Sequence, residues 1–428
     1  MKLINIFLLI IFTSLLSLGQ LQRITLGPVT ALYVHDVVLS IWIFFLIMTN
    51  VKKVFQDFFQ LMISFFSNKT VVLLFLLILI GWTGAVASNT FPLWTLLYSI
   101  RLLTYLTWGW LLFKLKPLTQ NWLLLTFISS GLLIGLFGLL QYFLIPDTRF
   151  LSILGWDDHF YRLLSTQLDP NFTGLLLIIT LFWLWSVPFH FWQWLIHGPS
   201  KKQLMDIQKI STGIASGMLL VGIGLTFSRS SLLALLVGGV IFVLIRFSKE
   251  IKNKKMTSKI STRILAVTGI VIITLIAAPK PSGEGVKLWR TSSAYARIVN
   301  TSNWVYSLEP YHLVMGRGLF VPPPQELLAP TGITADHANL PDNFFILLLS
   351  GIGIPGIVLC MLLLARKLPT VPVDAASTAI FGSVLTHSLF NNSLLQAFIL
   401  LFLLAKMVEN EMRNQLLEKI KATIETKP

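Results

Sequence analysis

The chain of 428 residues is 55% hydrophobic and only 12% charged, and its mean hydropathy is +0.77. Soluble domains carry about 25% charged residues, so this composition excludes a soluble protein and predicts an all-α polytopic membrane protein. The net charge of +15 could suggest nucleic acid. However, the basic residues gather in short segments between apolar runs, as expected for the loops of a membrane protein, and we expect no nucleic-acid partner.

Apolar runs long enough to cross a bilayer recur along the whole sequence. We predict about twelve transmembrane helices in a single integral membrane domain, residues 1–428. The predicted spans are 3–19, 30–49, 71–87, 94–113, 121–145, 170–187, 210–227, 231–246, 262–279, 343–365, 373–389 and 393–408.

Lysine or arginine follows every even-numbered span in this order. Basic loops stay on the cytoplasmic side, so we predict that both termini and the tail 409–428 are cytoplasmic. The odd-numbered loops are then extracytoplasmic. The large one, 280–342, lies between the ninth and tenth spans and is polar and rich in proline. Its acidic and basic residues balance, which favours arginines placed individually over a general anion-binding surface.

The first motif with chemistry is a tight turn at the predicted outer side, Thr226-Phe227-Ser228-Arg229-Ser230-Ser231. Arginine near a bilayer has an anionic partner or extends to the interface. Anion binding is favoured here, because Ser228 and Arg229 lie at a helix start, where free N–H groups attract anions. Simple extension of Arg229 to the interface is the alternative.

In the large loop, Arg297 is followed some residues later by Gly316-Arg317-Gly318. The spacing predicts a helix that lies on the membrane and then a glycine turn. Arginine binds phosphate oxygens in a bidentate manner, so Arg297 is a candidate phosphate ligand, with an ordinary surface arginine as the alternative.

The loop closes with Asp336-His337 and then Asp342-Asn343 before the tenth span. His337 and Asp342 are candidate general bases at a membrane surface. The alternatives are a solvated loop histidine for His337 and, for Asp342, a helix N-cap with Asn343 in the first turn. A group of glycines around Pro355 predicts a kink in that span.

Three further polar sites are noted. The segment from Arg162 ends in Asp-Pro-Asn at 169–171, which predicts a helix start. Arg101 lies inside the span 94–113, and His387 lies at the outer end of the span 373–389. Ionisable groups inside membranes are functional candidates, although a structural hydrogen bond would equally explain His387. The sequence contains no metal-ligand cluster, Walker loop, dinucleotide fingerprint or nucleophile elbow, so we expect no metal and no cofactor.

In order, spacing and sidedness, these motifs resemble the O-antigen ligase and O-antigen polymerase superfamily of bacterial envelope enzymes. The resemblance covers most of the chain and is most specific from Thr226 to Asn392. The matching residues are Thr226, Ser228 and Arg229 in the turn, Arg297 early in the large loop, Gly316 and Gly318, the pair Asp342-Asn343, and Gly353 and Gly356.

The resemblance implies metal-independent glycosyl transfer at the outer face of the bacterial cytoplasmic (inner) membrane. The donor would be a glycan on undecaprenyl pyrophosphate, and the acceptor a sugar or a lipid-linked sugar such as lipid A core. Membrane lipids and other proteins of polysaccharide assembly are the further expected partners. The leaving pyrophosphate would be stabilised by fixed arginines. We expect this role from Arg229 and Arg297, with help from Arg101 and Arg290.

The resemblance also implies a general base and a set of supporting residues. Family ligases use the histidine of a His-Asn pair as base, whereas this chain has Asp342 before Asn343. The base is therefore Asp342 or His337, and the aspartate favours the polymerase branch, with the ligase as the alternative. The expected supporting residues are Ser228, Asn343, Arg317 and His387.

Two other classes compete with an enzyme. Twelve spans with internal termini also suit a polysaccharide or lipid transporter or flippase, but no repeated halves are visible and the polar residues gather at the outer surface rather than at mid-membrane. A passive scaffold in polysaccharide assembly is the third class. Substitution of the outer arginines would disable an enzyme and leave a scaffold working.

Overall fold

A computed structural model describes residues 2–25, 31–63, 69–87, 93–196, 200–247, 254–281, 285–318, 341–367 and 374–425. The described chain is almost entirely helical, with one short antiparallel hairpin in which Arg23 pairs with Tyr33. The elements of the N-terminal half are α1 (Lys2–Leu18), η1 (Gly19–Gln22), β1 (Arg23–Thr25), β2 (Ala31–Tyr33), α2 (Val34–Thr49), α3 (Val51–Ile63), α4 (Lys69–Ala87), α5 (Leu93–Leu115), α6 (Gln120–Leu144), η2 (Arg149–Leu154), η3 (Ser165–Gln167), α7 (Pro170–Trp185) and α8 (Phe189–Leu195).

The described C-terminal half is also helical. Its elements are α9 (Lys201–Leu225), α10 (Arg229–Phe247), α11 (Lys254–Ala277), α12 (Ser292–Tyr306), α13 (Pro310–Met315), α14 (Phe344–Lys367), α15 (Ala375–Ser388), η6 (Ser393–Leu395) and α16 (Ala397–Glu425). Each of the twelve predicted spans overlaps one of these helices, because an apolar run in a membrane must satisfy its backbone internally as a helix. The bounds differ most at α9, which begins before the span 210–227, and at α16, which continues beyond the span 393–408.

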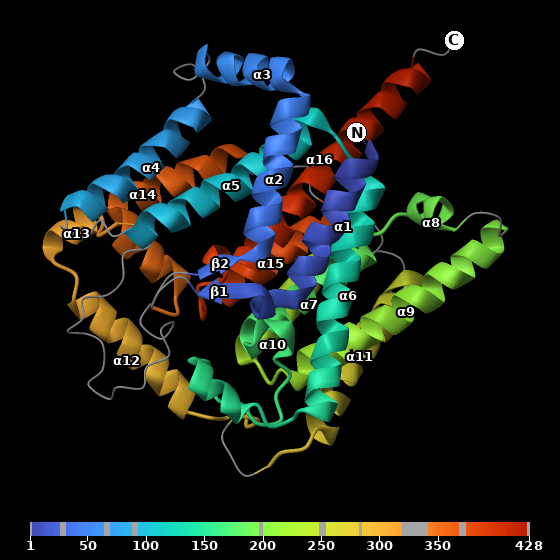
Figure 1. The fold of residues 1–428 in the computed structure, drawn as a ribbon. Helices are drawn as coiled ribbons and strands as arrows, with labels where there is room; N and C mark the ends of the chain where they lie inside the picture. Colours follow the sequence, from blue (N-terminus) through green and yellow to red (C-terminus); the bar gives the residue numbers. More distant parts are fainter. Residues whose placement is uncertain are drawn as a thin grey trace.

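Among the described residues, six helices are long and apolar enough to cross a membrane, or seven if one bent pair counts as a single span. The structure is therefore that of an all-α, multi-pass membrane protein, whereas the number of twelve spans stays a prediction. The bent pair is α2 and α3, which meet at 93°. The sequence analysis gave 51–63 to a loop, and the structure places the amphipathic helix α3 there instead, at the top of Figure 1.

Large side chains fill the middle of the bundle. Phe12, Trp108, Phe127, Trp183 and Phe402 are all fully buried and belong to one continuous apolar core. These rings come from five helices, α1, α5, α6, α7 and α16, so the core ties distant parts of the chain together. Burial of a side chain of this size contributes roughly 1.5–3 kcal/mol where it is removed from water.

Helices α10 and α15 run side by side and position the site described below. Gly238 allows the close approach, because a Cβ at this position would meet Ser383 Oγ at 2.0 Å. Ser383 Oγ donates a hydrogen bond across the contact to Ala234 O at 2.9 Å. The start of α10 and the end of α15 are thereby held at the same end of the pair.

The two ends of the molecule differ in the elements they carry. The N-terminus, α3 and the C-terminal end of α16 lie at the top of Figure 1, whereas α12 lies towards the bottom. This separation is the one expected if the termini share one side of a membrane and the large loop lies on the other. Which side is cytoplasmic stays a prediction.

The described part of the large loop forms α12 and α13. The helix that was predicted around Arg297 is α12, and the predicted glycine turn follows α13. Gly316 and Gly318 have φ of +72° and +108°, and the N–H groups of Arg317 and Gly318 donate to the carbonyls of Ser350 (2.7 Å) and Gly351 (3.0 Å) in α14. The turn thus docks on α14, which confirms the turn but leaves the membrane position of α12 a prediction.

The predicted kink in α14 is also present. Gly353 interrupts the helix with φ +64° and ψ −178°, two residues before Pro355. A Cβ at Gly353 would meet Val314 O at 2.7 Å and Gly316 N at 2.9 Å. The glycine turn therefore packs against the kink, and the two glycine motifs noted in the sequence contact each other.

Candidate functional site

A tight turn between α9 and α10 lies at the centre of the site. Phe227 has φ of +48°, so the chain reverses within a few residues. Thr226 Oγ1 accepts a hydrogen bond from the Ser228 N–H at 3.2 Å, and Ser228 Oγ accepts one from the Ser231 N–H at 3.3 Å. Ser228 therefore caps the start of α10, a position where serine is preferred, and the predicted turn is confirmed.

A second helix start meets this turn. Asp169 accepts hydrogen bonds from the N–H groups of Asn171 (2.6 Å) and Phe172 (2.9 Å), so the Asp-Pro-Asn sequence begins α7 as predicted. Ser228 Oγ donates to Asn171 Oδ1 at 2.8 Å. The N-termini of α7 and α10 thus lie together, with Asp169 capping the first N–H groups of α7 and Ser228 capping α10.

His387 joins these two starts to the end of α15. Its Nε2 lies 3.2 Å from Ser230 Oγ, and its Nδ1 lies 2.6 Å from Ser393 Oγ. Asn391 Nδ2 donates to Ser230 Oγ at 3.0 Å. We call these side chains the buried polar cluster: Asn171, Ser228, Ser230, Ser231, His387, Asn391 and Ser393. His387 is fully buried, so it holds the cluster together, which is the structural hydrogen bonding foreseen as its alternative role.

Two arginines bind consecutive carbonyls of the turn. Arg162 Nε donates to Thr226 O at 3.0 Å, and Arg290 donates to Phe227 O at 3.3 Å from Nη1 and 3.4 Å from Nη2. Arg290 Nη1 also donates to Gly285 O at 2.7 Å. Arg162 is only 5% exposed, and its Nη2 has no hydrogen-bond partner in the described part of the chain.

Arg229 fastens the turn to the large loop. Its Nη1 donates to Arg290 O at 2.9 Å, and its Nη2 donates to Ser293 Oγ at 2.9 Å. Both acceptors are neutral. Arg290 Nε reaches the same Ser293 Oγ at 3.2 Å, so two guanidinium groups share one hydroxyl at the start of α12.

Arg297, on α12, links the loop to the buried polar cluster. Its Nη2 donates to Asn391 Oδ1 at 3.2 Å, and its Nε lies 3.8 Å from Asp342 Oδ2. Arg297 and Asp342 are each about one-third exposed, at 31% and 37% of the side chain. Asp342 therefore stands at the accessible edge of the site, next to a candidate phosphate ligand.

We call Arg162, Arg229, Arg290 and Arg297 the arginine group. Arg290 and Arg297 are close enough to affect Arg162. Burial, followed by the charge of Arg290 and to a lesser degree that of Arg297, lowers the pKa of Arg162 to about 9, although Asp169 and Asp157 act in the opposite direction. A bound anion would relieve this repulsion and restore the pKa of the guanidinium.

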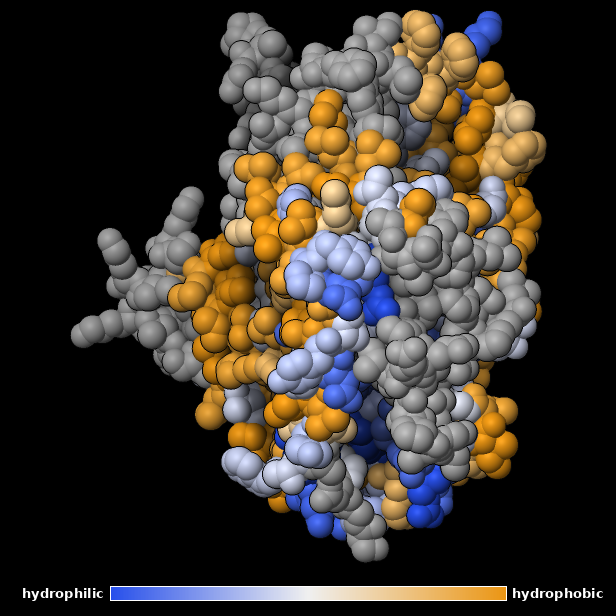
Figure 2. Space-filling view, turned by 90° about the vertical axis from the view of Figure 1, so that its left-hand side faces the viewer, coloured by the Kyte–Doolittle hydropathy of each residue, from blue (hydrophilic) through white to orange (hydrophobic). Residues whose placement is uncertain are grey.

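The surface over α12 matches this distribution of charge. Figure 2 shows hydrophilic side chains gathered around a hollow in the lower half of the view, at the height of α12 in Figure 1, and continuing upward to the middle of the view.

One sequence interpretation is wrong in its assignment of the helix cap. Asn343, rather than Asp342, caps α14: its Oδ1 accepts from the N–H groups of Phe345 (2.9 Å) and Ile346 (3.2 Å). Asn343 Nδ2 donates to Leu389 O at 3.0 Å, which ties α14 to the end of α15. The Asp342 carboxylate faces Arg297 instead.

Arg317 and Arg101 lie elsewhere. Arg317 is 7% exposed at the junction of α13 with α14, where its guanidinium lies 5.6 Å from the ring of Trp304. Arg101 forms an ion pair with Asp36 at 3.0 Å between α5 and α2. The structure thus brings Arg229, Arg290 and Arg297 together, as expected for a common role, and separates Arg101 from them.

Arg162 was missed as a site residue. The sequence analysis noted it only as the beginning of a segment that leads to a helix start, because no periodicity or motif links residue 162 to the turn at 226. His337, the second candidate base, lies outside the described residues. Within the described ranges no group of three or more His, Cys, Asp or Glu side chains could hold a metal ion.

Comparison with known proteins adds no relative. No protein-family model, no curated protein and no solved structure matches the chain. The functional argument therefore rests on the geometry of the arginine group and of the buried polar cluster.

Proposed function

We propose that the protein is a membrane glycosyltransferase of the O-antigen polymerase type. It moves a glycan from an undecaprenyl-pyrophosphate donor to a sugar acceptor at the outer face of the bacterial cytoplasmic membrane. The observation that carries this proposal is the arginine group, in which Arg162 and Arg229 donate to neutral oxygens and, among the described residues, are not paired with a carboxylate. Such a group is suited to a pyrophosphate.

The fold orients three guanidinium groups before a pyrophosphate binds. The carbonyls of Thr226 and Phe227 orient Arg162 and Arg290, and the turn itself supplies Arg229. Because these guanidinium groups are fixed before the donor arrives, they stabilise charge that develops on the leaving pyrophosphate without reorganising. The helix start of α10 adds the positive end of its helix dipole beside Arg229.

In the proposed reaction the acceptor hydroxyl attacks the anomeric carbon of the donor sugar. The new carbon–oxygen bond forms as the bond to the pyrophosphate oxygen breaks, and the electron pair leaves with the pyrophosphate. Asp342 accepts the proton of the hydroxyl. A donor phosphate that binds Arg297 weakens the 3.8 Å contact between Arg297 and Asp342, which leaves the carboxylate a stronger base.

The buried polar cluster supports this arrangement indirectly. Asn391 accepts from Arg297, and the cluster fixes Asn391 through Ser230 and His387. The guanidinium of Arg297 is therefore held from the protein side while its other edge faces Asp342. This chain of contacts gives His387 a positioning role at the proposed site.

The test is the envelope polysaccharide profile of a deletion strain complemented with wild type, Arg229→Ala, Arg229→Lys or Arg297→Ala. The matched control is Arg149→Ala, since Arg149 is an exposed arginine in the loop after α6, paired with Asp147 at 2.6 Å. We expect the control to restore long chains and the Arg229 and Arg297 variants to lose them, with single repeats still joined to the acceptor.

Two other outcomes have a defined meaning. Loss of all attached glycan, with lipid-linked polymer accumulating, would assign the protein to the ligase branch. Normal profiles from both alanine variants at normal protein levels would rule out the enzyme and favour a transporter or a scaffold.

A further inference from the structure

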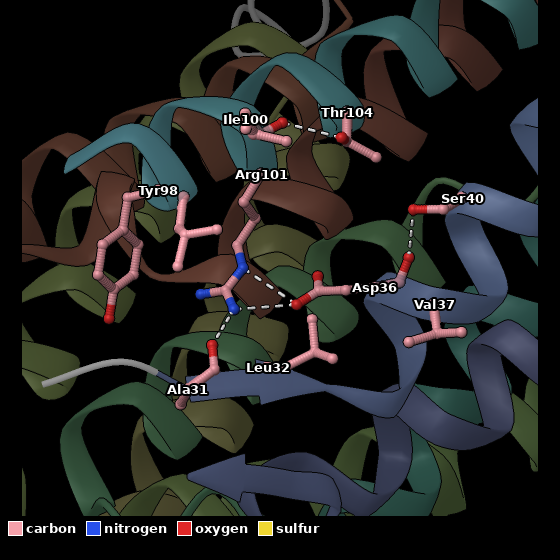
Figure 3. Close-up of a pocket in the computed structure, with 10 residues that line it drawn as sticks. Ala31, Leu32, Asp36, Val37, Ser40, Tyr98, Ile100, Arg101 and Thr104 are labelled. Carbon is pink, nitrogen blue, oxygen red and sulfur yellow. Dashed lines mark hydrogen bonds and ion pairs between the residues drawn. The ribbon is translucent and has the colours of Figure 1, made fainter. Parts of the chain in front are cut away.

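Arg101 lies at the boundary between two cavities that the proposed reaction does not use. The larger one, of about 280 Å³, lies between α2 and α5, and Figure 3 shows its lining. A smaller one, of about 150 Å³, lies between α5 and the start of α16. Arg101 and Tyr98 line both cavities, so these two side chains form the partition between them.

The guanidinium of Arg101 is held rigidly but keeps one nitrogen available. Its Nε and Nη2 each lie 3.0 Å from Asp36 Oδ2, and Nη2 also donates to Ala31 O. The rings of Tyr33 and Tyr98 lie 5.1 Å and 5.2 Å from its carbon centre. In the described part of the chain, Arg101 Nη1 makes no hydrogen bond, and it points towards Tyr98 in Figure 3.

Asp36 does not depend on Arg101 alone. Its Oδ1 accepts from the Tyr105 hydroxyl at 2.6 Å, and its Oδ2 accepts from the Tyr33 N–H at 3.1 Å. An ion pair that served only to join α2 to α5 would not require an arginine nitrogen directed at a cavity boundary. The N–H groups of Arg101 Nη1, which are hydrogen-bond donors, are the feature that indicates a ligand.

The walls of the larger cavity indicate the rest of the ligand. Leu32, Val37, Leu97 and Ile100 line it, and Val37, Leu97 and Ile100 are 42%, 40% and 49% exposed. In a membrane protein, side chains exposed on the flank of the bundle face lipid chains. The volume lies just below the range of about 300–1,000 Å³ typical of small-molecule sites, so the cavity suits a segment of a hydrocarbon chain that enters from the bilayer.

The position of the charged groups along α2 agrees with a lipid. Asp36 lies in the first turn of α2, and Ala31 lies in β2, just before that helix. The charged end of the cavity therefore lies near the start of α2, while its apolar walls extend along α2 and α5.

We propose that this cavity binds a lipid phosphate. A segment of its hydrocarbon chain lies between α2 and α5, and a phosphate oxygen accepts a hydrogen bond from Arg101 Nη1. The phosphate could belong to a membrane phospholipid or to a polyprenyl phosphate, which share this chemistry. The site is separate from the arginine group, so the proposal does not depend on the glycosyltransferase function.

The test is native mass spectrometry of the delipidated full-length protein with two probes, phosphatidylglycerol and undecaprenyl phosphate. Val37→Trp and Leu97→Trp fill the cavity from exposed positions and leave the ion pair intact. The control is Leu106→Trp, which is also on α5 and 42% exposed but does not line the cavity. Arg101→Lys tests the donor, because a lysine can keep the pair with Asp36 but cannot present Nη1.

We expect Val37→Trp, Leu97→Trp and Arg101→Lys each to weaken the binding of at least one probe about tenfold. This is the contribution of one charge-assisted hydrogen bond or of a few buried methylene groups. Leu106→Trp should bind both probes as wild type does. The probe whose binding falls identifies the source of the phosphate. Binding of both probes unchanged in Val37→Trp and Leu97→Trp, at unaltered melting temperature, would overturn the proposal.

Discussion

Arg297 and Asp342 face each other across the accessible edge of the site, with Nε and Oδ2 3.8 Å apart. They come from different parts of the large loop, α12 and the residues just before α14. The distance is longer than that of a direct hydrogen bond, so the pair is loose enough to be separated by a ligand. If the proposed function is correct, the two residues exchange this contact for substrate during each reaction.

The first prediction concerns Asp342. We expect Asp342→Asn to lower the rate of glycan transfer about 10²- to 10⁴-fold, the typical contribution of a general base. The fold should be unaffected, because Asn343 rather than Asp342 caps α14. The measurement is transfer from a synthetic polyprenyl-pyrophosphate donor by purified protein.

Asp147→Asn is the matched control for this experiment, since it removes an exposed carboxylate of the loop after α6. Transfer by Asp342→Asn at the wild-type rate would remove Asp342 as the base and leave His337 as the remaining candidate.

The second prediction concerns the kink of α14. Gly353→Ala places a Cβ 2.7 Å from Val314 O at a φ of +64°, so both sterics and backbone strain oppose it, and we expect a loss of about 1–3 kcal/mol of stability. Gly239→Ala in α10 is the control, because its Cβ would meet nothing within 4 Å. The control should be neutral or gain up to about 1 kcal/mol.

Thermal unfolding in detergent, followed by tryptophan fluorescence, compares the two glycine variants. Equal melting temperatures for Gly353→Ala and Gly239→Ala would show that the kink is not needed to receive the glycine turn.

The third prediction concerns pH. Burial, and then the charge of Arg290, lowers the pKa of Arg162 to about 9, and a bound anion raises it again. Below about pH 9 the group carries its proton with or without the anion, so the affinity does not change with this proton. Above about pH 9 the free site loses the proton, binding requires proton uptake, and the affinity falls.

Stabilisation of the purified protein by inorganic pyrophosphate, measured as a shift in melting temperature, should therefore be constant from about pH 7 to about pH 8.5 and decline above about pH 9. The protein without anion should gain stability in that upper range, because the unfolded chain then holds more protons than the folded one. Arg162→Gln should bind more weakly and lose the decline. A decline that persists in Arg162→Gln would contradict the assignment.

The fourth prediction concerns a buried ion pair in α16. Lys406 Nζ lies 2.7 Å from Glu409 Oε2, and the two residues are 2% and 0% exposed. Glu409→Leu leaves a buried ammonium with weaker compensation, so we expect a loss of about 3–5 kcal/mol. The double variant Lys406→Met with Glu409→Leu should regain most of this loss, because neither charge then remains. A double-mutant cycle on melting temperatures gives the coupling, and purely additive effects would contradict it.

The sequence was sufficient for the helices because long apolar runs in a bilayer have few alternatives to a helix. It was also sufficient for features carried by neighbouring residues, such as the turn at Ser228 and the start of α7 at Asp169. Segment 51–63 was assigned wrongly, because its lysines were used as a loop signal. The phenylalanines at 55, 58 and 59 recur at helical spacing after Lys52 and Lys53, a pattern that also suits an amphipathic helix.

Contacts between distant segments could not be predicted in the same way. Nothing local distinguishes Arg162, which binds Thr226, from Arg101, which pairs with Asp36, so the former was missed and the latter was grouped with the wrong arginines. Likewise, Asp342 and Asn343 are both good caps, and only the path of the chain at the end of α15, where Asn343 reaches Leu389 O, decides between them.

The shared use of Ser293 by Arg229 and Arg290 has a thermodynamic consequence. These arginines fasten the start of α12 to the turn, so a ligand that attracts either guanidinium must compete with that attachment. Under the proposed function, donor affinity and the attachment of α12 to the turn are coupled, and the coupling is reciprocal. A molecule that binds the outer face of α12 without touching the site would change donor affinity. This helix would then be an allosteric site.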